Sequence, residues 1–437
     1  MPPLEAKRLL YSLMMSTDEK ENIAMEFIDV SVAYLHARAI RDVYVRLPDE
    51  DYEENMCGKL VKAMYGTRDA AQCWEREYVN FMRKTGFTCG RSSPCVFYHP
   101  EKELRAVVHG DDFTIMGHTD ELDWFRDEMK KSFTIKAKAR LGPGQKGEQA
   151  TRELNRIVEY GDGVLYYEAD QRHAEDVISG MGLSSDSKTV VTPGTNTPTQ
   201  AGNIIMNDTQ FRMLAARCNY LAQDRPDIQF AAKEVCRKMS SPDEDAWGKL
   251  KRLARYLAGE SRVVYEYHRQ QTPSEIVVWS DTDFAGCKET RRSTNGGAIM
   301  LGGHCVKTWS STQAKIALSS GEAEFGGIVK AASEGMGVQS MLRDLGYDLP
   351  LIINTDSSAA IGMGTRHGLG KVKHLDLKEM WIQERVMNGD MVLTKVSGEN
   401  NIADLMTKHL DRNKVDHYLE KLSIKRRRGR HTIAPTR

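Results

Sequence analysis

The chain has 437 residues, of which 40% are hydrophobic and 28% charged, and its 61 Lys and Arg residues are balanced by 61 Asp and Glu residues. This length predicts two or three domains with buried cores. No apolar run approaches the roughly 20 residues that a membrane-spanning helix needs, which excludes that class of protein. The formal net charge is zero, so the chain lacks the excess of Lys and Arg that is typical of phosphate-binding proteins. A surface that binds nucleic acid would therefore depend on how the charges are distributed.

The cysteines and the N-terminus indicate the compartment. The eight cysteines are scattered, without a Cys-x-x-Cys pair or a neighbouring pair of histidines. This pattern argues against a zinc site and favours reduced, mostly buried thiols. The first residues, MPPLEAKRLLYSLMMS, have neither the apolar core nor the cleavage site of a signal peptide. We therefore expect an intracellular protein.

Helices and strands alternate over residues 1–140. LEAKRLLYSLMM predicts a helix, and AMEFIDV predicts a strand that ends near Asp29. After a mixed stretch that ends at Pro48, GKLVKAMYGTRDAAQCWEREYVNFMRKTGF predicts a short strand, a turn at Gly66 and a long amphipathic helix. Residues 119–140 add a charged helix and a strand. This order predicts an α+β domain over 1–140.

Two adjacent acids interrupt the apolar stretch RAVVHGDDFTIMGH, residues 105–118. The pattern predicts a hairpin in which His109 and Gly110 supply the turn, followed by Asp111 and Asp112. Paired carboxylates repel each other, and a divalent cation with oxygen ligands relieves that repulsion. Ordinary turn chemistry is the alternative interpretation, because Gly and Asp are common in turns.

The sequence pattern predicts a second region over residues 141–270, composed of strands and helices. Its strand GVLYYEA and helix QRHAEDVISGMGL precede a polar linker near residues 190–205. A helical unit follows, and it is interrupted at Arg225-Pro226-Asp227 because Pro disfavours continuation of the preceding helix. At the other end of the chain, residues 416–437 form a basic tail. We expect its last part, KRRRGRHTIAPTR (residues 425–437), to be disordered; it is either a nucleic-acid or nuclear-import element or a solvated chain end.

From about residue 275 the pattern predicts a separate α/β domain, in the order β-β-β-α-β-α-β-α. Four of its acids lie at strand ends or helix starts, namely Asp281, Glu322, Asp356 and Asp404. Such positions gather at the carboxyl edge of a sheet. Four carboxylates there could hold two Mg²⁺ about 3.5–4 Å apart for phosphodiester cleavage. Taken singly, each acid also fits a simpler role at a helix N-terminus or in a turn.

Several stretches resemble one protein family. WSDTDFAGCKETRRSTNGG, TWSSTQAKIALSSGEAEF, NTDSSAAIGM, VKHLDLKEMWIQERV and NIADLMTKHL resemble, in this order, the ribonuclease H of copia-type LTR retrotransposons. Upstream, IDVSVAYLHARAIRDVYVRLP, KLVKAMYGTRDAAQCW, GFTCGRSSPCVFYH and HGDDFTIMG resemble the reverse transcriptase of the same Pol polyprotein. NYLAQDRPDIQFAAKEVCRKMSSPDEDAWGKLKRLARYL resembles the connection between the two. The similarity covers roughly residues 5–415.

The resemblance implies an α+β polymerase palm over 1–140, N-terminally truncated so that the fingers are missing, then a thumb- or connection-like region over 141–270 and an α/β ribonuclease H-like domain over 271–415. It implies an RNA-directed DNA polymerase with ribonuclease H that acts on an RNA template, a DNA primer, an RNA–DNA hybrid and dNTPs. Two Mg²⁺ would serve each active site, with Mn²⁺ as an alternative. The compartment would be a cytoplasmic particle or the nucleus, without membrane contact; the oligomeric state is left open.

In the polymerase, the resemblance implies that Asp29 and Asp111 are metal ligands and that Asp112 supports them. Tyr34 would be the aromatic residue that blocks a ribose 2′-hydroxyl; a core aromatic is the other interpretation of Tyr34. Gly66 lies in the block that contacts template and nucleotide.

In the ribonuclease H, the resemblance makes metal ligands of Asp281, Glu322, Asp356 and Asp404. Glu324, the second acid of Gly-Glu-Ala-Glu, replaces Glu322 if that side chain faces away from the site.

The chain departs from the family pattern at several points. His109-Gly110 stands where Tyr-Val is usual, and Ala71 stands where Pro is usual. The loop KVSGENN, residues 395–401, has no His of the kind that some ribonucleases H use for product release, which leaves His374 for that role or no residue. Missing fingers would weaken nucleotide binding, so a polymerase-dead remnant that only cleaves hybrids or binds nucleic acid is the first alternative. A host protein that binds nucleic acid without catalysis is the second.

Overall fold

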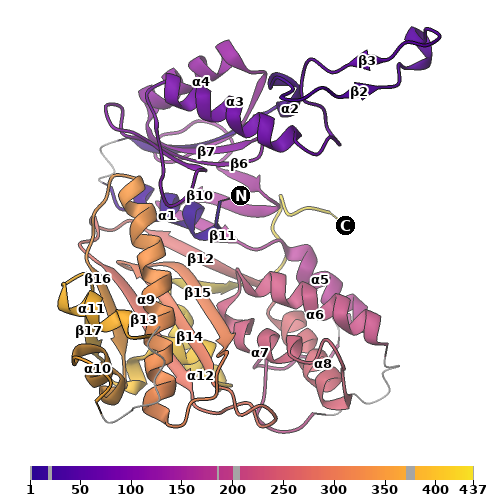
Figure 1. The fold of residues 1–437 in the computed structure, drawn as a ribbon. Coiled ribbons are helices and arrows are strands. Elements are labelled where there is room, and N and C mark those ends of the chain that lie inside the picture. The colour runs from indigo at the N-terminus through magenta and orange to yellow at the C-terminus, as the bar shows by residue number, and fades with distance from the viewer. Residues whose placement is uncertain (1, 18–21, 185–186, 200–206, 371–378, 437) are drawn as a thin grey trace. The chain divides into compact units, whose positions relative to one another are not determined.

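The computed structural model describes the chain apart from residues 1, 18–21, 185–186, 200–206, 371–378 and 437 (Figure 1). It divides into two compact units. Unit 1 comprises residues 1–149 and 340–348, and unit 2 comprises residues 150–339 and 349–437. Among the described residues, no helix is long and apolar enough to cross a membrane. The finer domain boundaries at 140, 270 and 415 stay predictions.

Unit 1 is built on a six-stranded sheet in which all neighbouring strands are antiparallel. Its strands in spatial order are β4 (Thr88–Cys89), β5 (Val96–His99), β6 (Leu104–His109), β7 (Asp112–His118), β1 (Ile23–Val30) and β8 (Ile135–Leu141). The sheet therefore brings β7 beside β1, and with it the predicted acids from two distant parts of the chain.

Two amphipathic helices cover one face of this sheet, and their aromatic side chains form its core. They are α3 (Ala70–Lys84) and α4 (Thr119–Ser132). Trp74, Tyr78 and Phe81 of α3 are buried with Phe125 of α4, as the sequence predicted for α3. The remaining helices are α1 (Leu4–Met14), which contacts β1, β6 and β7, and the short α2 (Ala33–His36).

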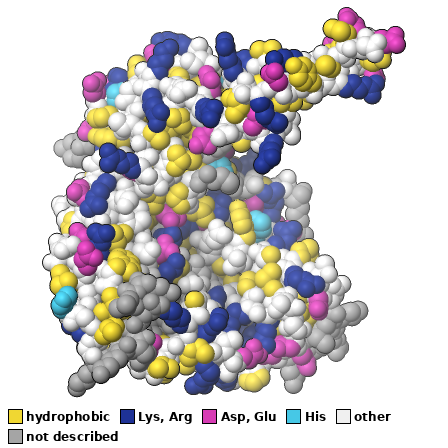
Figure 2. All heavy atoms as spheres, viewed as in Figure 1, with side chains coloured by type: hydrophobic (Ala, Val, Ile, Leu, Met, Phe, Trp, Pro, Cys, Tyr) yellow, Lys and Arg dark blue, Asp and Glu magenta, His cyan; other side chains and the backbone are white. Residues whose placement is uncertain are grey.

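A narrow arm projects from unit 1 (Figure 1). It holds the two-stranded sheet of β2 (Tyr44–Val45) and β3 (Gly58–Lys59), and a short 3-10 helix, η2 (Asp49–Asp51), lies between the two strands. Acidic side chains gather at the tip of this arm, whereas acidic and basic side chains are interspersed over the rest of the visible face (Figure 2). Away from the tip of the arm, this face therefore shows acidic and basic side chains side by side, as the equal numbers of the two in the sequence would suggest.

The Asp-Asp hairpin forms, but its turn is shifted by one residue from the predicted one. His109 still belongs to β6 and pairs with Asp112, the first residue of β7. The turn consists of Gly110 and Asp111, and Gly110 has a φ of +65°. A two-residue hairpin turn needs positive φ, which Gly adopts without strain and His does not, so placing the turn at His109-Gly110 was wrong.

Unit 2 contains a five-stranded antiparallel sheet beside a group of helices. The strands in spatial order are β18 (Ile424–Arg427), β12 (Arg262–His268), β11 (Val164–Glu168), β10 (Arg156–Gly161) and β9 (Ala150–Glu153). The helices are α5 (Gln171–Gly180), α6 (Asp208–Ala222), α7 (Pro226–Cys236) and α8 (Glu244–Gly259). The predicted helix break is confirmed, because α6 ends at Ala222 and Pro226 opens α7.

The expectation of disorder over residues 425–437 was wrong for the first of these residues, because they belong to β18 (Ile424–Arg427). Residues Arg412–Lys421 form α12, and β18 pairs with β12. The basic side chains of this segment have acidic partners: Lys425 pairs with Glu266, Arg426 with Asp416, and Arg430 with Glu175. A charge run predicts solvation only when tertiary partners are missing, and here β12, α12 and α5 supply them.

The α/β part of unit 2 has the predicted order of strands, and the fold class predicted for it is confirmed. Two helices lie between its last two strands where one was predicted, and the final predicted helix, NIADLMTKHL, contains the 3-10 helix η5 instead. Its sheet runs β15 (His304–Thr312), β14 (Thr294–Leu301), β13 (Ile276–Asp283), β16 (Leu351–Thr355) and β17 (Val392–Lys395). The pairs β13–β16 and β16–β17 are parallel. Its helices are α9 (Ser320–Asp344), α10 (Ser358–Thr365) and α11 (Trp381–Met387), and the 3-10 helices η4 (Gly398–Asn400) and η5 (Ile402–Met406) precede α12.

Candidate active sites

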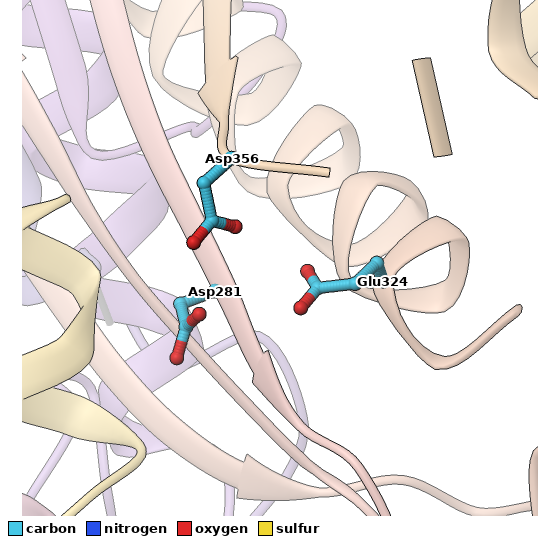
Figure 3. A group of neighbouring side chains, drawn as sticks. All are labelled: Asp281, Glu324 and Asp356. Carbon is cyan, nitrogen blue, oxygen red and sulfur yellow. The ribbon is translucent and has the colours of Figure 1, made fainter. Parts of the chain in front are cut away.

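Three carboxylates meet at one edge of the α/β sheet of unit 2. Asp281 lies near the end of β13, Asp356 directly follows β16, and Glu324 lies in α9 (Figure 3). One carboxylate oxygen of each lies within 4.8 Å of those of the other two. The two aspartates converge because β13 and β16 are adjacent and parallel, so their carboxyl ends share an edge.

The structure brings Glu324 into this group and leaves Glu322 out of it. The carboxylate of Glu322 accepts a hydrogen bond of 2.8 Å from the backbone N–H of Leu318. At 3.6 residues per turn, two helix positions that are two apart point in nearly opposite directions, so only one of these acids can face the sheet. The placement of Glu322 in the acidic group was therefore wrong, and the alternative, Glu324, takes its position.

A signal for Glu324 is present in the sequence of α9. Gly327 and Gly335 lie three and eleven positions after it, on the same face of the helix. A Cβ on Gly327 would lie 2.4 Å from the Thr282 hydroxyl, and one on Gly335 would lie 2.9 Å from the Val278 side chain. This small-residue face is the one that contacts the sheet, and Glu324 belongs to it.

Two of the three carboxyl groups, Glu324 and Asp356, have raised pKa values, whereas Asp281 is paired with Lys408. Burial, followed by the charges of Asp281 and Asp356, raises the pKa of Glu324 to about 8. Burial and Asp281 also raise the pKa of Asp356. The Oε2 atom of Glu324 is buried and has no hydrogen-bond partner among the described residues. A buried oxygen without a partner, next to two further carboxylates, fits a hard divalent cation with oxygen ligands.

Asp404, the fourth predicted acid, lies in η5 close to Asp281. Lys408 joins the two, because its Nζ lies 2.5 Å from Oδ1 of Asp404 and 3.3 Å from Oδ2 of Asp281. The hydroxyl of Thr407 also donates a hydrogen bond to Asp281. Burial and the charge of Asp281 raise the pKa of Asp404 to about 6, although Lys408 acts in the opposite direction. All four positions of the predicted site are thus adjacent once Glu324 replaces Glu322.

The predicted polymerase acids lie together in unit 1. Asp29 on β1 and Asp112 on β7 are direct cross-strand partners. Lys138 on β8 bridges them: its Nζ lies 3.1 Å from Oδ1 of Asp29 and donates a hydrogen bond to Asp112. Asp111 lies in the exposed turn, where partial burial and the charges of Asp112 and Asp29 raise its pKa. The division into ligands Asp29 and Asp111 with Asp112 in support stays a prediction.

Two further predicted residues flank these acids. Tyr34 in α2 stacks on Tyr65 with a ring separation of 4.3 Å and is only partly buried against the core, so the geometry is compatible with either interpretation. Gly66, in the turn before α3, has a φ of +89° that favours glycine. The indole N–H of Trp74 holds the hairpin turn by donating a 2.8 Å hydrogen bond to the carbonyl of Gly110. His374 lies outside the described residues.

The sequence of the chain is similar to those of known proteins. A family model described as reverse transcriptase (RNA-dependent DNA polymerase) matches residues 3–143. The retrovirus-related Pol polyprotein from transposon RE1 of Arabidopsis thaliana is 28% identical over 413 residues, which cover 91% of this chain and 27% of the relative. The corresponding polyprotein from transposon TNT 1-94 of Nicotiana tabacum is 26% identical over 433 residues, 94% of this chain and 31% of the relative.

The chain therefore spans about a quarter to a third of the length of these curated relatives. Among solved structures, a foamy viral protease-reverse transcriptase in complex with RNA/DNA hybrid matches with a TM-score of 0.46 and 8% identity, over 89% of this chain and 45% of that chain.

Proposed function

Because the chain belongs to the family of copia-type retrotransposon Pol polyproteins, we propose that unit 2 hydrolyses the RNA strand of an RNA–DNA hybrid and that unit 1 carries out RNA-directed DNA synthesis. The observation that carries the proposal is the group of Asp281, Glu324 and Asp356. It supports nuclease chemistry because Glu324 places a buried oxygen without a hydrogen-bond partner among the described residues beside two further carboxylates, and ionising such a group is costly unless a cation binds it.

Asp281, Glu324, Asp356 and Asp404 are the residues that would hold two Mg²⁺. Such ions, when bound, activate water and stabilise the leaving oxygen of a phosphodiester. The protein's own part is to fix the carboxylates on rigid elements. Asp281 and Asp356 are held by paired strands and Glu324 by a helix in close contact with the sheet. This rigidity supports cleavage at one defined position of the bound strand.

For DNA synthesis, Asp29, Asp111 and Asp112 would bind the cations that accompany the primer end and the incoming dNTP. The cross-strand pairing of Asp29 and Asp112 supports this role, because it holds two carboxylates at a fixed separation. Tyr34, on the short helix that follows β1, would contact the sugar of the nucleotide. The RNA template and the DNA primer are proposed as partners on the same ground.

A second candidate is a ribonuclease H with an inactive palm. One observation favours it: Lys138 already neutralises Asp29 and Asp112, whereas Glu324 in the nuclease has an unpaired oxygen among the described residues. A covalently attached ammonium competes with a cation for the palm acids. Catalysis there would require Lys138 to move.

One assay separates these candidates. The purified chain is incubated with Mg²⁺ and an end-labelled RNA–DNA hybrid that has a recessed 3′ DNA end, with and without dNTPs. The variants are Asp356→Asn, Asp111→Asn and, as a control at an exposed position, Asp390→Asn. RNA cleavage lost only in Asp356→Asn, together with extension lost only in Asp111→Asn, is the expected result. Cleavage without extension supports the second candidate, and neither activity in the wild type contradicts both.

A further inference from the structure

A cavity of about 560 Å³ lies beside the nuclease acids in unit 2. Asp356 and Asp404 line one side of it, and α12 lines another with Lys414, His417 and Tyr418. The site is thus a pocket with an acidic wall and a helical wall that carries basic and polar groups. The sequence predicted only the acidic wall.

The position of α12 is well defined by its contacts. Val415, Tyr418 and Leu419 are buried, so the opposite side of the helix is directed outward. The side chain of Asp411 caps the helix by accepting the N–H of Lys414, and Arg426 of β18 pairs with Asp416. These anchors keep the exposed His417 at the cavity rather than on a free chain end.

Phosphodiester hydrolysis needs a proton donor at this cavity. The leaving sugar oxygen becomes negatively charged and must take up a proton. The carboxylates of the cluster are proposed cation ligands, and Lys408 is engaged by Asp281 and Asp404. Imidazole is the side chain that gives and takes protons near neutral pH, and His417 supplies the imidazole among the described residues that line the cavity.

We propose that His417 is a further catalytic residue of the ribonuclease H reaction and that it protonates the leaving sugar oxygen. The inference rests on the proposed function. In the step, the water oxygen forms a bond to phosphorus and releases a proton to bulk water. The bond from phosphorus to the sugar oxygen breaks, the electron pair stays on that oxygen, and the oxygen takes the proton of His417. Solvent then reprotonates the imidazole, so atoms and charge balance.

Other charged and titratable groups face the same cavity, and they define the surroundings of the imidazole. From other elements these are Asp356, Glu399, Asp404 and Lys408, and from α12 itself Lys414 and Tyr418. Three of them are carboxyl groups and two are lysines, of which Lys408 is already paired with Asp281 and Asp404. In the sequence, a loop and the first turn of α12 separate His417 from Asp404, the last of the four proposed ligands. The packing of α12 brings His417 to the cavity.

The test uses the full chain with His417→Ala and His417→Gln, and with His367→Ala as a control at an exposed position outside the cavity. In steady-state cleavage of a hybrid, we expect kcat to fall about 100-fold in both His417 variants, with KM within about twofold of the wild type. Imidazole in the buffer should restore part of the activity of His417→Ala. It should not restore Asp356→Asn, which lacks a carboxylate.

A second substrate distinguishes proton donation by His417 from a purely structural role of this residue. When sulfur replaces the leaving oxygen at a single cleavage position, the thiolate departs without a proton, so His417→Ala should cleave this substrate as fast as the wild type does. Unchanged kcat in His417→Ala overturns the inference. So does an equal loss on both substrates without imidazole rescue. An inactive wild type overturns the proposed function as well, whereas an active wild type beside an unaffected variant overturns only the role of His417.

Discussion

In each unit a lysine lies between two aspartates of a candidate active site. The two sites differ in the environment of a further acidic side chain, which is buried in unit 2 and exposed in unit 1. Lys138 contacts both members of the cross-strand pair Asp29 and Asp112. Lys408 contacts Asp281 and Asp404, and no contact of 4.0 Å or less joins it to Glu324 in the structure of the described residues. The raised pKa of Glu324, about 8, means that a proton neutralises this carboxyl at neutral pH. A cation displaces a proton more readily than it displaces the ammonium group of a lysine side chain, so we expect the acid group of unit 2 to bind cations more tightly than that of unit 1.

The largest expected effect is on the rate of hybrid cleavage, and it tests which glutamate belongs to the acid group of unit 2. Glu324→Gln should lower the rate of hybrid cleavage on the order of 10³-fold, because it removes a proposed ligand from the buried group. Glu322→Gln, the matched control two positions away, should stay within about threefold of the wild type. Cleavage rates under single-turnover conditions measure both. A larger loss of cleavage rate in Glu322→Gln than in Glu324→Gln would show that Glu322, and not Glu324, belongs to the site.

The pH dependence of cation binding should separate the two sites next. Below pH 8 the carboxyl of Glu324 is protonated, and a cation must displace that proton. The apparent affinity of the nuclease for Mn²⁺ should therefore fall by up to about tenfold for each pH unit below 8 and level off above it. Titration of the protein with Mn²⁺ between pH 6 and 8.5, followed by electron paramagnetic resonance, gives the slope. Glu324→Gln should flatten it, and an equally steep slope in that variant would contradict the assignment.

The palm lysine offers a sharper comparison. Lys138→Met should raise the affinity of the palm for Mn²⁺ on the order of tenfold, because it removes the competing ammonium from the acid pair. The same variant should melt at a lower temperature in EDTA, since Asp29 and Asp112 then repel each other, and Mg²⁺ should restore the melting temperature. Calorimetric titration and thermal melting provide the two readouts. Unchanged affinity would mean that Lys138 does not compete with cations.

The smallest effect tests how each acid group is held in place. Trp74→Phe removes the hydrogen bond to the Gly110 carbonyl, which should destabilise the palm hairpin by about 1 kcal/mol. Cation affinity at the palm should drop about threefold, while hybrid cleavage by the nuclease, whose aspartates are held by paired strands, should not change. Mn²⁺ titration and cleavage rates of the same preparation measure both. A loss of cleavage in this variant would show that the two sites are not independent.

Local pattern in the sequence determined the order of elements and most of the acids. Apolar strands that end in Asp281 and Asp356 predict a shared sheet edge, because the period of a strand and the parallel pairing of its neighbours leave few alternatives. The break at Pro226 and the amphipathic face of α3 were likewise readable, since each depends on residues within a few positions. The family resemblance added the roles of these acids, and roles do not follow from spacing.

Tertiary packing decided everything that depends on partners distant in sequence. The choice of Glu324 over Glu322 follows from which face of α9 contacts the sheet, and a carboxylate at either position satisfies the same local pattern. Lys138 and His417 reach their sites only because β8 pairs with β1 and α12 packs beside the acids. The start of the basic segment 425–437 forms part of β18, where Glu266 of β12 pairs with Lys425. Charge interactions act through space, so their partners are fixed by the fold rather than by the neighbouring residues of the chain.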